Sequence, residues 1–283
     1  MKTKNLKRRI VVGDVHGELG SLKEILIHAK LIDRKDNWTG EHSVLIQTGD
    51  VIDRGPDSWG CIEFLQKIQK QAQDAGGQVV RLCGNHEVML MENSSNRYAN
   101  FENPEKLASL IKEEISLGKI QASYTDGERL YTHAGLRSEI RAALEKEIGA
   151  ERVDLKRLSD HINKVFRDAV KKKDFETHAI FHVDLKRGGS HEVGGIFWGD
   201  YSLICDSLMA YNIPQIFGHT PTRKKGVMHS HSFKLIDIDA GMHDGYGGNI
   251  LYLEISKSDN ILQHHKDGDV WIETVLVPEK EKR

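Results

Sequence analysis

The 283-residue sequence is poor in cysteine and proline and has no long hydrophobic run. Its three cysteines, Cys61, Cys83 and Cys205, form no C-x-x-C pair, which argues against a disulfide framework and against a zinc knuckle. We therefore expect a reducing, cytoplasmic location. No apolar stretch approaches the length of a membrane span, and the basic start is followed by too few apolar residues for a secretion signal, so neither feature is expected.

An excess of one charge is also missing. Lysines and arginines number 40 against 42 aspartates and glutamates, so the formal net charge is −2. Such a chain has no strong field to attract a nucleic acid or an anionic membrane, and we expect neither partner. With 39% hydrophobic residues and only five prolines, the chain can bury one large core, and we expect a single domain over residues 1–283.

Short apolar runs that end at small and polar residues recur along the sequence. Residues 10–12, 43–47 and 78–83 are such runs, and helix-period stripes of apolar residues lie between them. Asp50 follows Asp14 by 36 residues, a spacing that suits a βαβ crossover. The pattern predicts parallel strands whose carboxyl ends meet at one edge of a sheet.

Later segments extend this prediction to a fold class. We expect an α/β fold, a two-sheet βαβαβ sandwich with flanking helices. Segments at about 92–126 and 138–212 interrupt the alternation, and we expect them to form a helical cap or insertion over the strand ends. Three further apolar runs predict strands of a second, mixed or antiparallel sheet, namely residues 233–238, 249–255 and 270–277.

Groups that carry chemistry directly follow five of the apolar runs. Gly-Asp-Val-His-Gly supplies Asp14 and His16, and Gly-Asp-Val-Ile-Asp-Arg-Gly supplies Asp50, Asp53 and Arg54. One such cluster alone could be an aspartate turn beside a structural histidine. Five clusters at successive strand ends favour one shared site. The remaining clusters are Asn85, His86 and Glu87 in Gly-Asn-His-Glu, His133 in His-Ala-Gly, and His219 in Gly-His-Thr.

These five motifs resemble the metal and catalytic blocks of the calcineurin-like metallophosphoesterases, in the phosphoprotein phosphatase branch. Residues 45–58, 75–79 and 84–89 are similar to the Shewanella-like protein phosphatases, as are Arg97-Tyr98 and residues 246–248. The resemblance is dense over about residues 8–100 and continues in separate blocks to about residue 250.

The resemblance implies a site for two divalent metal ions, with manganese favoured and iron or zinc as alternatives. Carboxylate oxygens and imidazoles suit these metals. The two metal ions would share a bridging hydroxide that attacks phosphorus directly, without a covalent phosphoenzyme. Carried over by motif, the ligands would be Asp14 and His16 for one ion, Asp50 as the bridge, and Asn85, His133 and His219 for the other.

The same resemblance implies roles for residues beside the metals. His86, hydrogen-bonded to Asp53, would protonate the leaving oxygen as a general acid. Arg54 would bind the phosphate through its planar guanidinium. Glu87 would orient a ligand or the loop that carries it.

One block departs from the family pattern. Relatives carry a second phosphate-binding arginine near a tryptophan, whereas Asp200 closely follows Trp198 here. Three arginines could take its place, and we favour Arg97 over Arg187 and Arg223 because it follows the Gly-Asn-His-Glu motif closely. Asp239, after a late apolar run, is equally open to a structural and a functional interpretation.

The function predicted from these residues is a metal-dependent phosphomonoesterase that acts on phosphoprotein, at phosphoserine, phosphothreonine or phosphotyrosine. Its partner would be a phosphorylated protein or a small phosphomonoester. One alternative is a nucleotide hydrolase similar to symmetrical diadenosine tetraphosphatases, against which Asp53 and Glu87 argue. An RNA-end phosphatase conflicts with the balanced charge. A non-catalytic, partner-binding pseudophosphatase is disfavoured because the ligand set and His86 are intact.

Overall fold

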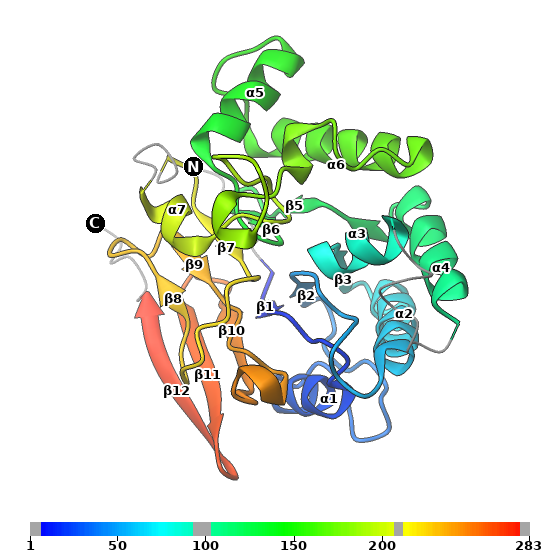
Figure 1. The fold of residues 1–283 in the computed structure, drawn as a ribbon. Helices are drawn as coiled ribbons and strands as arrows, with labels where there is room; N and C mark the ends of the chain where they lie inside the picture. Colours follow the sequence, from blue (N-terminus) through cyan, green and yellow to red (C-terminus); the bar gives the residue numbers. More distant parts are fainter. Residues whose placement is uncertain (1–6, 93–102, 207–211, 278–283) are drawn as a thin grey trace.

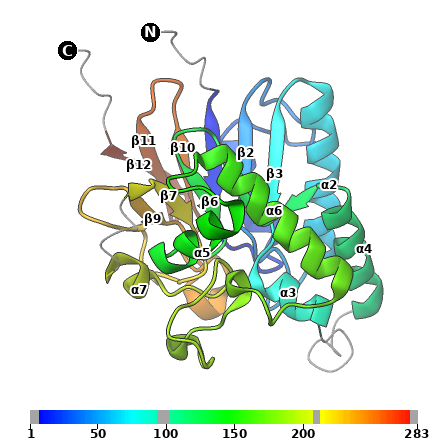
Figure 2. The same cartoon turned by 90° about the horizontal axis from the view of Figure 1, so that it is seen from above.

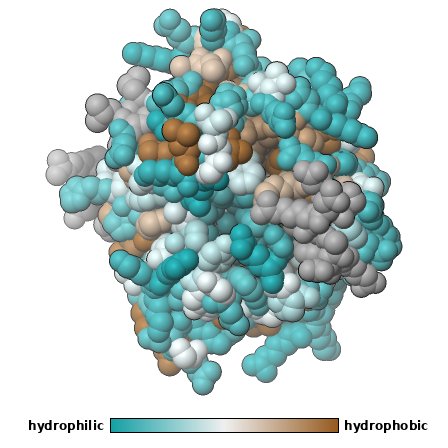
Figure 3. Space-filling model, in the orientation of Figure 1, coloured by the Kyte–Doolittle hydropathy of each residue, from teal (hydrophilic) through white to brown (hydrophobic). Residues whose placement is uncertain are grey.

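Two mixed β-sheets pack face to face in the computed structural model, which describes residues 7–92, 103–206 and 212–277. Helices lie on the outside of this sandwich (Figure 1). The α/β two-sheet architecture expected from the sequence is therefore confirmed. The face of the molecule shown in Figure 3 is mostly hydrophilic, and the hydrophobic residues visible there form small, separate patches.

The first sheet has the strand order β12-β11-β10-β1-β2-β3-β4. Strands β1 to β4 run parallel, as the strand-and-helix spacing predicts. The strands are β1 Arg9–Val12, β2 Val44–Gln47, β3 Gln78–Leu82, β4 Ile120–Gln121, β10 Leu251–Ile255, β11 Ile261–Asp267 and β12 Val270–Val277.

The second sheet has the order β5-β6-β7-β9-β8, in which β6, β7 and β9 are parallel neighbours. Its strands are β5 Ser123–Thr125, β6 Leu130–Thr132, β7 Gln215–Phe217, β8 Met228–His229 and β9 Leu235–Asp237.

The sheet assignment of the last strands is the main correction to the sequence prediction. Residues 249–255 and 270–277 were expected in the second sheet, but β10 pairs antiparallel with β1, and β12 is the outer strand of the first sheet. β11 lies between them and was not predicted, because its sequence is rich in polar residues. Strand pairing over such distances depends on tertiary contacts that the local pattern does not contain.

The central strand β1 separates two layers of the core. Ile10 and Val12 pack with the buried faces of α1 and α2, whereas Val11 packs between the two sheets. Successive side chains of a strand point to opposite faces, so a run without polar residues fits a strand that is covered on both sides.

The helices connect these strands and cover them (Figure 2). α2 is capped at its start by the Asp57 carboxylate, which accepts a hydrogen bond from the Gly60 amide. No helix in the described ranges is both long and apolar enough to cross a bilayer. The helices are α1 Leu19–His28, α2 Ser58–Asp74, α3 Asn85–Glu92, α4 Pro104–Ser116, α5 Ser138–Ile148, α6 Leu155–Lys172 and α7 Tyr201–Asp206, with short 3₁₀ turns η1 Ala179–Phe181, η2 Leu185–Arg187 and η4 Asp244–Tyr246.

Of the two segments expected to form a cap, part of the first belongs to the sheets and part of the second reaches the strand ends. Residues 120–125 belong to the sandwich, because β4 pairs with β3 and β5 pairs with β6. Residues 138–206 form α5, α6 and the turns that follow. From this second segment, Val183, Arg187 and Trp198 reach the cavity described below.

Candidate active site

A cavity of about 450 Å³ lies where the carboxyl ends of strands from both sheets meet. This is the edge at which open α/β sheets place their sites. The cavity brings together most of the residues that the motifs single out. Its lining comprises Asp14, His16, Asp50, Arg54, Asn85, His86, Met89, Val183, Arg187, Trp198, His219, Pro221, Arg223, Asp239 and Tyr246.

The loops after β1 and β2 are tied to each other. The amides of Val15 and His16 both donate to the Asp50 carbonyl, at 2.9 Å. His16 and Asp50 adopt left-handed backbone conformations, with φ values of 48° and 52°. Non-glycine residues rarely do so, and such strain is typical of functional sites.

Glu87 holds the loop that carries Asp50. Its buried carboxylate accepts hydrogen bonds from the amides of Asp50 (3.0 Å), Val51 (2.9 Å) and Ile52 (3.2 Å), and from Gly84 (2.7 Å). The expectation that Glu87 orients a loop is therefore confirmed. The packing is close, because a Cβ atom on Gly84 would lie 2.1 Å from Asp50 Oδ1.

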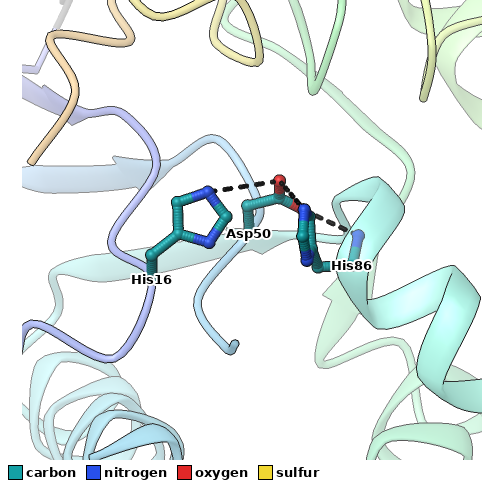
Figure 4. A group of neighbouring side chains, drawn as sticks. All are labelled: His16, Asp50 and His86. Carbon is teal, nitrogen blue, oxygen red and sulfur yellow. Dashed lines mark hydrogen bonds and ion pairs between the residues drawn. The ribbon is translucent and has the colours of Figure 1, made fainter. Parts of the chain in front are cut away.

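Asp50 lies at the centre of the histidines. Its Oδ2 atom is 3.8 Å from Nε2 of His16 and of His86 (Figure 4). The same atom is 3.6 Å from Nε2 of His133. His133 Nε2 is also 3.1 Å from His219 Nδ1. The structure thus forms two groups that could hold a metal ion, His16–Asp50–His86 and Asp50–His133–His219.

Asn85 and Asp14, which follow β3 and β1 of the first sheet, lie beside the histidines of the second sheet. Asn85 Oδ1 lies 2.9 Å from His133 Nε2, and Asp14 Oδ1 accepts a hydrogen bond from the His219 amide at 3.2 Å. All six residues that the resemblance names as metal ligands are buried at this edge.

The electrostatics of the cluster fit a bound cation. Burial lowers the pKa of His16 and of His133 to about 3, so both imidazoles are neutral and able to act as ligands. Burial raises the pKa of Asp14, and the nearby Asp239 and Asp50 raise it further. His219 Nε2 is buried without a hydrogen-bond partner among the described residues. Crowded buried carboxylates beside an unpaired imidazole nitrogen are costly unless a cation joins them.

His86 contacts Asp53 as the resemblance implied. Nδ1 of His86 lies 2.6 Å from Asp53 Oδ2. Burial lowers the pKa of His86, but Asp50 and the hydrogen bond to Asp53 outweigh this effect, so the pKa is raised above its usual value. The other ring nitrogen, Nε2, lies 3.4 Å from Arg54 Nη2, and the Arg54 guanidinium is 4.9 Å from the centre of the Tyr246 ring.

Of the three arginines that the sequence analysis considered for the second phosphate-binding position, Arg187 and Arg223 line the cavity. Arg187, at the end of η2, lines the cavity, and its Nη2 donates to Thr220 Oγ1 at 2.6 Å. The same atom is 3.2 Å from Asp200 Oδ2, so the acid found where relatives have arginine fixes a different arginine. Arg223 also lines the cavity, whereas Arg97 lies outside the described residues.

Asp237 was missed by the sequence analysis. It ends β9, is fully buried, and its Oδ1 accepts a hydrogen bond from the Asp239 amide, while Oδ2 has no partner in the described part of the chain. Burial raises its pKa, and Asp239 raises it further. Two acids two positions apart at a strand end were the available signal, because such residues share one face of the strand.

The family follows from a direct comparison. The sequence profile of the calcineurin-like phosphoesterases matches residues 7–223. The chain belongs to this family. The phosphoesterase is 41% identical over 86 residues to Shewanella-like protein phosphatase 2 of Arabidopsis thaliana, a match over 30% of the chain and 22% of that protein. It is 42% identical over 98 residues to Shewanella-like protein phosphatase 1 of Plasmodium berghei, over 35% of the chain and 26% of that protein.

These matches span only about a quarter of the length of both relatives. A longer match, to an uncharacterised protein of Schizosaccharomyces pombe, is 26% identical and covers 88% of the phosphoesterase and 77% of that protein. Among solved structures, the cold-active protein-tyrosine phosphatase of a psychrophilic Shewanella species superposes with a TM-score of 0.70 at 23% identity, over 96% of this chain and 80% of that one. This similarity establishes the shared fold.

Proposed function

We propose that this calcineurin-like phosphoesterase is a metal-dependent phosphoprotein phosphatase that cleaves phosphomonoesters. The observation that carries the proposal is the cavity itself, where the His86–Asp53 pair and two arginines surround a buried cluster of neutral imidazoles and carboxylates. The names of the Arabidopsis and Plasmodium relatives, both protein phosphatases, support the substrate class. So does the protein-tyrosine phosphatase with the same fold.

The metal ions would be held by the buried cluster. Their positive charge would bind the phosphate and acidify the attacking water. We propose manganese, which accepts both oxygen and imidazole ligands. The ligands would be Asp14, His16, Asp50, Asn85, His133 and His219.

His86 belongs to a candidate metal group, but its neighbours favour a proton donor. Asp53 fixes Nδ1, so Nε2 is left to carry the proton toward the leaving oxygen. The raised pKa keeps that proton available near neutral pH.

Arg54 and Arg187 would bind the phosphate oxygens that do not react. Arg54 is steadied by the ring of Tyr246, and Arg187 by Thr220 and Asp200. Guanidinium groups held in this way present a planar fork to phosphate and lose little conformational entropy on binding.

A turnover assay tests the proposal. With Mn²⁺ added, the protein is given p-nitrophenyl phosphate, a phosphotyrosine peptide, a phosphoserine peptide and diadenosine tetraphosphate in parallel. We expect release of phosphate from p-nitrophenyl phosphate and from at least one peptide. Hydrolysis of diadenosine tetraphosphate alone would contradict the proposal and favour a nucleotide hydrolase.

A further inference from the structure

A second positive group lies at the rim of the cavity, on the loop that follows β7 and His219. Arg223 lines the cavity and is exposed to solvent. In the described ranges its guanidinium has neither a hydrogen bond nor an ion pair, unlike those of Arg54 and Arg187. The side chain is therefore available to a ligand.

The loop holds Arg223 in place by its backbone. Arg223 has a φ of 54°, in the left-handed region that arginine seldom adopts. The preceding Thr222 braces this conformation, because its amide donates to the Asp239 carbonyl at 3.0 Å and its hydroxyl donates to the Gly226 carbonyl at 3.0 Å. The Thr222 hydroxyl also accepts a hydrogen bond from the Lys224 amide at 2.9 Å. The loop thus fixes the backbone from which the Arg223 side chain extends.

Among the cations of this loop, Arg223 is the one that both lines the cavity and has no ion pair in the described ranges. Lys225 forms an ion pair with Asp267, and Lys224 does not line the cavity. Arg187, farther along the lining, is already engaged by Thr220 and Asp200. Pro221 and Trp198 contribute apolar lining to the same cavity. A substrate that passes over this rim would meet an apolar wall and one unpaired guanidinium.

We propose that Arg223 forms a rim subsite for a carboxylate side chain close to the phosphorylated residue of a peptide substrate. The inference rests on the phosphoprotein phosphatase function proposed above. A guanidinium matches a carboxylate in planar geometry, and a peptide must leave the cavity across its rim on either side of the phosphorylated residue. The subsite would make the enzyme prefer phosphopeptides with acidic neighbours.

A pair of phosphopeptides tests this subsite. Both carry the same phosphorylated residue, flanked on both sides by aspartate in one peptide and by asparagine in the other. Because exposed ion pairs contribute about 0.2–1 kcal/mol, we expect kcat/KM for the acidic peptide to exceed that for the neutral one by about 1.4- to fivefold. This ratio should fall as salt is raised, since added ions screen exposed charges.

Variants of Arg223 test whether its charge causes the higher kcat/KM for the acidic peptide. Arg223→Asn removes the charge and keeps a residue that tolerates the left-handed backbone, so the ratio should fall to about one. Arg223→Lys should retain most of the preference. Lys224→Asn, a matched change of an exposed neighbouring cation outside the lining, should leave the ratio as in the wild type.

The outcomes separate this inference from the proposed function. A ratio that is unchanged in Arg223→Asn overturns the rim subsite alone. So does an equal loss on both peptides, which would mean that Arg223 binds the phosphate rather than a neighbouring acid. Failure to hydrolyse either peptide, with p-nitrophenyl phosphate still turned over, overturns the phosphoprotein function and the subsite together.

Discussion

The two ends of the sandwich bury charge in different ways. At the amino end of β1, Arg9 is almost fully buried and pairs with Asp126 at 2.7 Å and with Asp259 at 3.1 Å. Arg129 binds both oxygens of Asp259 at 2.7 Å, and the Tyr131 hydroxyl donates to Asp126. Every carboxylate of this network therefore has a positive or hydrogen-bonding partner.

At the carboxyl end of the same strand, the buried carboxylates accept hydrogen bonds from backbone amides, but none of them forms an ion pair with a lysine or arginine in the described ranges. Asp14 lies among the carboxylates of Asp50, Asp237 and Asp239, and His219 Nε2 has no hydrogen bond within the described residues. Buried polar groups are normally satisfied, so unpaired ones call for an explanation. The comparison teaches that buried charges with partners at one end of β1 serve stability. Buried charges without ion-pair partners at the other end mark a place for ions and substrate.

The strongest test of this contrast is Asp50→Asn. The bridging carboxylate offsets the repulsion between two ions, so the variant should lose turnover to the assay background and lose bound metal. Metal analysis of the purified protein measures this loss, with the exposed Asp269→Asn as control. Two metal equivalents per chain and normal turnover would refute the assignment of Asp50.

A large but selective loss is expected for His86→Asn. General acid catalysis contributes about 10²–10⁴-fold, so a poor alkyl leaving group should suffer far more than p-nitrophenolate, which needs no proton. Metal content should stay near normal. Steady-state rates on the two esters, compared with the exposed His231→Asn, give the answer. Equal losses on both esters would show that His86 is not the proton donor.

At the opposite end, Asp126→Asn should affect stability and not chemistry. Removing one carboxylate leaves buried Arg9 with weaker compensation, and breaking such a pair costs about 3 kcal/mol. Urea unfolding should show the loss, while turnover per folded molecule stays at the wild-type value. Asp269→Asn again serves as the control. An unchanged midpoint would mean that the paired end does not contribute as the comparison claims.

The smallest effect in this series is predicted for Arg54→Ala. Charge-assisted hydrogen bonds are worth about 1.5–3 kcal/mol, so kcat/KM should fall at least about tenfold. The exposed Arg34→Ala controls for a general change in charge. If Arg54→Ala keeps the wild-type kcat/KM, Arg54 does not bind the phosphate.

The sequence best predicted the positions of those site residues that directly follow a strand of the first sheet. Asp14, Asp50 and Asn85 each come after a parallel strand, and consecutive crossovers deliver such residues to one edge of the sheet. For His133 and His219, the sequence indicated a place after an apolar run, but it did not show that the two strands belong to a second sheet. No local periodicity says that β6 and β7 face β1 across the core.

The sequence could not choose between residues whose positions depend on contacts made by folding, and the choice of Arg97 stays a prediction because it lies outside the described residues. Arg187 was one of three arginines that spacing could not separate, and its position depends on Thr220 and Asp200, which meet it only in the folded chain. Residues 249–255 were assigned to the wrong sheet because an apolar strand fits either side of a sandwich equally well. A cytoplasmic location stays a prediction.

The closeness of Gly84 to Asp50 has a consequence for how the chain tolerates change. Gly84 carries no chemistry, yet any side chain there would press on the Asp50 carboxylate from 2.1 Å away. In a library of single variants selected for activity, position 84 should be depleted as strongly as the acids it borders. Gly20, which has open space around it within α1, should accept alanine freely. The two glycines would then give opposite answers in one selection, although neither donates, accepts or binds through a side chain.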